Sequence, residues 1–406
     1  MKRKGHLYDQ MCDKALIREA IKNAAKGKTK HRHVRAILAD MDGSVDFIYK
    51  LLTTGTFCPT PYICDTVLEG TGRKKREISK PAFWPDQVIH WCIYLTLRPW
   101  LFQRIYGLNF GSIPGRGVHC AKRIVEKWIR GDHKNTKYYL KMDVRKFYPS
   151  IQPARVIEKL RRIIKDERFL ALNAQILGMS PGLPIGMLLS QVYANFFLTD
   201  MDYWIKQELQ ACHYIRYMDD MVIFGRNKKQ LHKMRDAISQ RLRADGLTMK
   251  GNWQVCRTDK EPLDFMGFRF YRDRTTLRKR LMLAITRSIR KAGRAGYRVS
   301  PHLASSAVSY LGWIKCSDSH RLYDKWIRPY LHIQILKNAI RRKQYEDLQK
   351  HVYRQARHLG QGIVPGQGVS PYQHPRGSRG DRRTGPREDV RIRHDRVHQP
   401  RVSAYA

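Results

Sequence analysis

The segment 138–255 alternates between strand-like and helix-like stretches, and the order of these stretches limits the fold more than any other feature of the sequence. Strands are predicted at 138–144, at 213–217 and 221–224 on either side of a tight turn, and at 247–255, and helices at 190–208 and 231–245. The second helix is predicted because Leu231, Met234, Ile238 and Leu242 recur on one face and Gly246 is placed to end it. The order strand, helix, strand, strand, helix, strand predicts an α+β fold with a split βαβ (ferredoxin-like) unit. Its helices would pack on one side of an antiparallel sheet and leave the other face free to hold a ligand.

Three carboxylates are predicted to meet at one end of this sheet. Asp143 lies near the end of the first strand, and Asp219 and Asp220 lie in the turn of the adjacent hairpin. A single aspartate after a strand, or an Asp-Asp pair, is usually a turn residue, so neither piece carries much weight alone. Three convergent carboxylates call for cations, and hard ions such as Mg²⁺ or Mn²⁺ take oxygen ligands and act in pairs about 4 Å apart. We therefore predict a site for two divalent ions.

The net charge of the chain indicates a polyanionic partner. The 406 residues include 78 Lys and Arg against 35 Asp and Glu, which gives a formal charge of +43 spread along the whole length. Nucleic acid fits this charge because its binding releases counterions, whereas a membrane-surface protein usually carries one concentrated amphipathic basic segment. No such segment, signal peptide or apolar run of 18 residues is found, so we expect a cytoplasmic protein without membrane contact. The eight cysteines form no CxxC pair and are expected to be reduced thiols.

Several motifs in the same order resemble those of reverse transcriptases. They are KMDVRKFYPSI (141–151), the loop and helix GLPIGMLLSQVYANFFL (182–198), the hairpin RYMDDMVIF (216–224), LTMK (247–250) and FMGFRF (265–270). The resemblance covers about residues 70–330 and implies a right-hand polymerase that copies RNA into DNA. Its parts would be an N-terminal segment and fingers (1–137), a palm with inserted fingers elements (138–275), a helical thumb (276–358) and a flexible basic tail (359–406).

The resemblance also implies roles for individual residues. Asp143, Asp219, Asp220 and the backbone of Val144 would hold the metal ions, and Lys250 would donate a proton to pyrophosphate or be a solvated strand lysine. The remaining implied contacts, to the incoming nucleotide or template, are made by Arg76, Tyr148, Gly186, Ser190 and Gln191. Arg76 belongs to a basic group, 73–76 with Lys80, that would bind the triphosphate or be a solvated charge run. Tyr148 would exclude a ribose 2′-hydroxyl or be a core aromatic.

The central loop suggests a subtype. The pattern IG followed by SQ resembles reverse transcriptases of diversity-generating retroelements, although Met187 stands where that family usually has a polar residue beside the template and nucleotide. That membership implies an RNA template, a nucleic-acid primer, deoxynucleoside triphosphates and a small basic accessory protein as partners. Alternatives are a defence-associated or retron-like reverse transcriptase and a non-catalytic RNA-binding or maturase-like protein. An RNA-dependent RNA polymerase shares the palm, but Tyr148 and the YMDD turn resemble the DNA-making branch.

Overall fold

The computed structural model describes residues 3–69 and 74–358, and the described residues up to Gln344 form one compact unit. Its palm sheet consists of β3 (Tyr138–Asp143), β4 (His213–Tyr217), β5 (Asp220–Gly225) and β6 (Gln254–Arg257). The strand order is β4-β5-β3-β6 and every neighbouring pair is antiparallel. Numbered within the unit this order is 2-3-1-4, which confirms the predicted split βαβ arrangement.

The two faces of the palm sheet are covered differently. Leu140 and Met142 of β3 join a large core with α5 (Val88–Leu101), α10 (Leu188–Phe197), α11 (Thr199–Gln207) and α12 (Lys228–Ala244). Tyr139, on the opposite face, joins a second core with α6 (Val118–Gly131) and a small sheet of β7 (Leu263–Phe265), β8 (Phe268–Phe270) and β9 (Thr275–Leu277). We predicted that this second face is free to hold a ligand. The structure differs, because part of the face is covered by this core. Asp143 lies on this same face at the end of β3, because successive side chains of a strand alternate between faces.

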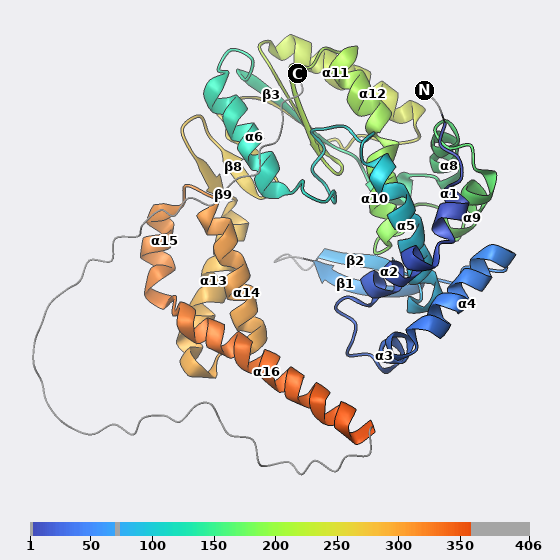
Figure 1. The fold of residues 1–406 in the computed structure, drawn as a ribbon. Coiled ribbons are helices and arrows are strands. Elements are labelled where there is room, and N and C mark those ends of the chain that lie inside the picture. Colours follow the sequence, from blue (N-terminus) through green and yellow to red (C-terminus); the bar gives the residue numbers. More distant parts are fainter. Residues whose placement is uncertain (1–2, 70–73, 359–406) are drawn as a thin grey trace, which may run out of the picture. The chain divides into compact units, whose positions relative to one another are not determined.

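The elements that the resemblance predicts as fingers are mostly helical (Figure 1). They comprise α1 (Leu7–Met11), α2 (Lys14–Ala25), α3 (Arg32–Ala39), α4 (Met41–Thr54), the π-helical turn η1 (Phe83–Gln87) before α5, α7 (Phe147–Ser150), α8 (Pro153–Arg161) and α9 (Glu167–Leu177). Strands β1 (Ile63–Glu69) and β2 (Lys74–Lys80) pair as an antiparallel hairpin. This hairpin is tied to the central loop, since Ser79 N donates to Ile185 O at 2.8 Å.

The C-terminal elements beyond the small sheet are helical. They are α13 (Lys279–Ala295), η2 (Gly296–Arg298), α14 (Pro301–Lys315), α15 (His320–Trp326), η3 (Arg328–Tyr330) and α16 (Ile333–His358). Along α13, Met282, Ile285, Ile289 and Ala292 are buried, which is the spacing of one helical face. A separate unit begins at Tyr345, and the predicted tail 359–406 lies outside the described residues.

Two predicted elements differ from the structure. The helix expected at 190–208 is two helices, α10 and α11, that meet at Leu198. The strand expected at 247–255 is reduced to an isolated bridge between Met249 and Val144 and to the short strand β6, because Gly251 and Asn252 form a turn between them. Among the helices of the described residues, none is both long and apolar enough to cross a membrane.

Candidate active site

Asp143 and Asp220 lie side by side at one end of the palm sheet. They are direct partners in the antiparallel register of β3 and β5. Asp219 precedes Asp220 in the turn between β4 and β5, which we name the carboxylate turn (residues 217–220). Met218 in this turn has φ +56°, a left-handed conformation that is uncommon for a non-glycine residue and that surrounding contacts must hold. The structure thus brings together the three carboxylates that the sequence singles out.

The local electrostatics show that the three carboxylates repel one another. Burial, followed by the neighbouring carboxylates of Asp143 and Asp220, raises the pKa of Asp219 to about 7. Burial also raises the pKa of Asp220, with a further contribution from Asp143 that Lys141 and Lys250 oppose. Both shifts mean that the ionised site is unfavourable without a compensating cation, and that the site gains affinity for a cation as pH rises through about 7.

A cationic group already contacts one of the three carboxylates. The Lys250 ammonium forms an ion pair with Asp143 Oδ2, and Lys250 N donates to the Asp143 carbonyl at 2.8 Å. The other carboxylate oxygen, Asp143 Oδ1, is buried without a hydrogen-bond partner. Val144, the predicted backbone ligand, follows directly and is fully buried. An orphaned anionic oxygen beside two further carboxylates fits a hard divalent ion, because such ions are bound by oxygen ligands.

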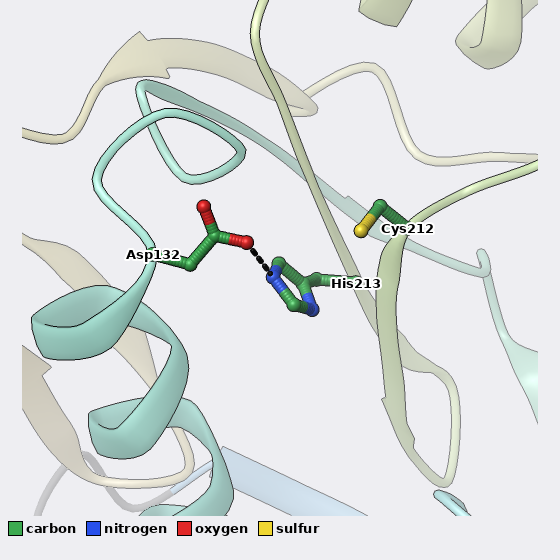
Figure 2. Close-up of side chains that lie close together, drawn as sticks. All are labelled: Asp132, Cys212 and His213. Carbon is green, nitrogen blue, oxygen red and sulfur yellow. Dashed lines mark hydrogen bonds and ion pairs between the residues drawn. The ribbon is translucent and has the colours of Figure 1, made fainter.

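A different group of side chains has the most compact set of potential metal ligands within the described residues. Asp132, Cys212 and His213 lie close together (Figure 2), and their ligand atoms are all within 4.8 Å of one another, a limit that the three active-site carboxylates do not meet. The oxygens of Asp132 are, however, already occupied, since Asn135 donates to both and His213 Nε2 lies 2.9 Å from Oδ2. These Asn135 bonds, and then His213, lower the pKa of Asp132 to about 2. We interpret the group as a hydrogen-bonded junction between the end of α6 and the start of β4.

Tyr148 lies near the carboxylates, and Arg76 lies near Tyr148. The Tyr148 hydroxyl is 3.6 Å from the sulfur of Met218 in the carboxylate turn. Burial, and then the charge of Asp219, raises the pKa of Tyr148 to about 12, while the charge of Arg76 acts in the opposite direction. The phenol is therefore neutral at physiological pH. The Tyr148 side chain is close enough to Asp219 and to Arg76 to interact electrostatically with both.

The central loop contacts the β1–β2 hairpin through Gly186. This residue has φ +111°, and an added Cβ would lie 2.4 Å from Ile78 and 3.0 Å from the Ser79 carbonyl, so only glycine fits. Gln191 is exposed near the start of α10, whereas the Ser190 side chain is buried with no hydrogen-bond partner for its hydroxyl.

Met187 departs from the family pattern in this loop. Its side chain is buried, and its sulfur lies 3.7 Å from the Tyr62 hydroxyl. Met187 occupies the N-cap position of α10 without a side-chain cap bond, a position where a polar residue would normally accept a backbone hydrogen bond. The departure from the family pattern therefore concerns the start of a helix and the core behind it.

The sequence interpretation missed a buried ion pair directly behind the carboxylate turn. Arg216 of β4 and Asp202 of α11 both have fully buried side chains, joined by bonds of 2.7 Å and 2.5 Å. The available signal was an arginine inside the strand 213–217, whose neighbours Ile215 and Tyr217 are apolar or aromatic, since a buried charge needs a partner elsewhere in the fold.

Comparison with known proteins identifies the domain. Residues 85–270 match the family described as reverse transcriptase (RNA-dependent DNA polymerase), a range that includes Asp143, Asp219 and Asp220. The retron Ec73 reverse transcriptase of Escherichia coli is 23% identical over 320 residues, which is 72% of this chain and 99% of that protein.

Solved structures of telomerases also align with the chain. An apo telomerase from Candida tropicalis, truncated from its C-terminal domain, aligns with a TM-score of 0.42 and 14% identity over 56% of this chain and 59% of that one. A Candida albicans telomerase in complex with a fragment of telomeric RNA aligns with a TM-score of 0.43 and 10% identity over 76% and 64%. The chain spans less than two thirds of either telomerase chain.

The family match extends from η1 to β8 and includes the whole palm sheet and the carboxylate turn. The palm topology, 2-3-1-4 with antiparallel neighbours, is a property of the structure and does not depend on that match. Residues 85–270 therefore match a reverse transcriptase domain within a right-hand polymerase fold, and this match supports an RNA-directed DNA polymerase.

Proposed function

We propose that the enzyme copies an RNA template into DNA at the end of the palm sheet, where Asp143, Asp219, Asp220 and the Val144 carbonyl hold two Mg²⁺ or Mn²⁺ ions. The observation that carries this proposal is the convergence of three carboxylates with one orphaned oxygen and a pKa raised to about 7. A chain with a formal charge of +43 otherwise has no electrostatic reason to gather anions at a surface that meets phosphates.

The protein's own side chains divide the work of the reaction. When bound, the ions would activate the primer hydroxyl and stabilise the charge that develops on the pyrophosphate. The carboxylates orient the reacting groups, while the ammonium of Lys250, now paired with Asp143, would move to the departing pyrophosphate and give it a proton. Arg76 and its basic neighbours would bind the triphosphate, and Gly186 and Gln191 would contact the nucleotide and template. Gly186 supports this arrangement because its lack of a side chain lets β2 approach the loop.

Tyr148 is proposed to exclude ribonucleotides by occupying the space that a ribose 2′-hydroxyl would need. We expect Tyr148→Ala to incorporate ribonucleotides at least about tenfold better relative to deoxynucleotides, because a clash of this kind is worth about 1–3 kcal/mol. Competition between the two nucleotide classes in single-nucleotide primer extension measures this ratio. Tyr148→Phe keeps the ring and should keep the discrimination of the wild type, and unchanged discrimination in the alanine variant would remove the role.

The biological role is proposed to be mutagenic copying for a diversity-generating retroelement, with a structured RNA and a small basic accessory protein as partners. The IG and SQ pattern of the central loop supports this. Met187, the one departure from the family pattern in this loop, is buried. A retron-like role is the second candidate, and the alignment over 99% of the retron Ec73 reverse transcriptase favours it. A non-catalytic RNA-binding role has no comparable support.

Primer extension on a defined RNA template with deoxynucleotides and Mg²⁺, with every product sequenced, tests both levels of the proposal. DNA made by the wild type and absent with Asp219→Ala/Asp220→Ala protein is the expected result for the polymerase site. Errors concentrated at template adenines are expected for the retroelement role. Accurate DNA would reject that role and favour the retron-like one, while DNA made equally by the alanine variant would reject the proposed site.

A further inference from the structure

We propose that Arg216, with Asp202, Asn195 and the segment 108–111, positions the carboxylate turn for catalysis. These residues contact neither substrate nor metal in the proposed site, so they act through Asp219 and Asp220 as positioning residues. The inference rests on the proposed function, because it assumes that the turn carries the metal-binding carboxylates.

Every nitrogen of the Arg216 guanidinium group donates a hydrogen bond. Its fork binds Asp202, with Nε donating to Oδ1 and Nη2 to Oδ2. The outer side of the fork points back at the turn, because Nη1 donates to the Met218 carbonyl at 2.9 Å and Nη2 to the Asn195 carbonyl at 3.1 Å. A fifth, longer bond of 3.4 Å joins Nη1 to Asn195 Oδ1. Five N–H groups thus meet acceptors, which fixes the guanidinium plane in one orientation.

The segment 108–111 holds the same turn from the other side. Its backbone pairs with Arg216, since Arg216 N donates to Leu108 O at 3.1 Å and Phe110 N to Arg216 O at 3.0 Å. Asn195 connects the two sides, because its Nδ2 donates to Gly111 O at 2.6 Å. Gly111 lies directly against Met218: an added Cβ would be 2.6 Å from Met218 Cγ and 2.8 Å from its backbone nitrogen. The turn therefore lies between a guanidinium and a backbone with no space for a methyl group.

Positioning accounts for this ion pair better than stability does. Burial raises the pKa of Asp202 against the effect of Arg216, whereas the pairing with Asp202 raises the pKa of Arg216 against the effect of burial. A buried ion pair of this kind often stabilises a fold no better than packed apolar side chains would. What apolar side chains could not do is donate a hydrogen bond to the Met218 carbonyl, which holds the left-handed conformation that presents Asp219 next to Asp143.

Two glycines of one loop provide a matched test. Gly111→Ala forces the backbone of Met218 to shift, whereas Gly107→Ala adds a methyl group with no atom within 4 Å. We expect Gly111→Ala to lower kcat for primer extension about 10- to 100-fold, since misplacement of reacting groups by about 1 Å has effects of this size. The Mg²⁺ concentration for half-maximal rate should rise, while the nucleotide KM and the affinity for template–primer should change little. Gly107→Ala should behave as the wild type.

Arg216→Lys provides an independent variant. It keeps a cation against Asp202 but loses the planar fork that reaches Met218, so kcat and the Mg²⁺ requirement should change in the same direction. If Gly111→Ala does not fold, as judged by its melting curve, this variant decides. Wild-type kcat and Mg²⁺ dependence in a folded Gly111→Ala or Arg216→Lys protein would overturn the inference. Asp219→Asn in the same assay separates the two levels: an active Asp219→Asn protein rejects the proposed site itself, and an inactive one leaves only the positioning inference in question.

Discussion

Asp219→Asn is expected to lower primer extension by at least about 10³-fold, equivalent to about 4 kcal/mol of transition-state stabilisation. Asparagine keeps the shape of the side chain but removes one of the three charges that would hold the ions, and Asp143→Asn and Asp220→Asn should behave alike. Asp236→Asn on the outer surface of α12 is the control, because its side chain is 64% exposed and the change in net charge is the same. A rate within threefold of the wild type would remove Asp219 from the catalytic machinery.

The same variant should change stability in the opposite direction. A carboxyl group whose pKa is raised in the folded state binds its proton more tightly there than in the unfolded chain. Its contribution is therefore fully present at low pH and is lost as pH rises through about 7. At pH 8 without divalent ions, Asp219→Asn should melt at a higher temperature than the wild type, and saturating Mg²⁺ should reduce or reverse the difference. Loss of activity together with a gain in metal-free stability would distinguish a functional carboxylate from a structural one.

Asp202→Ala is expected to destabilise the protein by about 3–5 kcal/mol, because it leaves the guanidinium of Arg216 buried without its counterion. Urea unfolding monitored by tryptophan fluorescence measures this loss as a lower midpoint. Asp200→Ala is the matched control on the same helix. Its side chain is 53% exposed, and its partner Lys159 keeps Asp245 as a second acidic neighbour, so a change of less than about 1 kcal/mol is expected. Equal effects of the two variants would contradict the importance of the buried pair.

A double replacement separates the two roles of that pair. Arg216→Met/Asp202→Leu removes both charges together and should recover most of the stability lost in Asp202→Ala, since no unpaired charge remains. It cannot recover the hydrogen bond to the Met218 carbonyl. We therefore expect a stable protein whose rate stays low, and recovery of both properties would indicate that the pair serves packing alone.

The sequence was sufficient to predict the palm because its signals are local. The apolar face of α12, the strand at Tyr138–Asp143 and the hairpin around residues 217–220 each have a clear period, and their order leaves one common topology. Convergence of Asp143 with Asp219 and Asp220 followed from that topology.

The failures come from contacts between distant segments. Nothing near Met187 in the sequence indicates that Tyr62 and the core lie behind it. Arg216 of β4 likewise pairs with Asp202 of helix α11, and Gly111 lies against Met218 in the carboxylate turn. Neither contact produces a periodic pattern in the sequence that would reveal it. The covering of the sheet by α6 and the small sheet also depends on docking of remote elements. Residue roles such as those of Arg76, Tyr148 and Lys250 depend on a bound substrate and remain predictions.

The partial covering of the second face of the palm sheet has a consequence for the electric field around the enzyme. Tyr139, Ile215, Val222 and Phe224 are buried on this face, which Asp143 and Asp220 share, among apolar side chains of α6. A medium of low polarisability on one side of a group of charges directs their field toward the solvent on the other side. The negative potential of three carboxylates is thus concentrated outward into a small volume, surrounded by a chain whose overall charge is strongly positive. Cations are attracted to that volume while phosphates are attracted to the surface around it, so the two kinds of ion that the proposed reaction must bring together are separated before any of them binds.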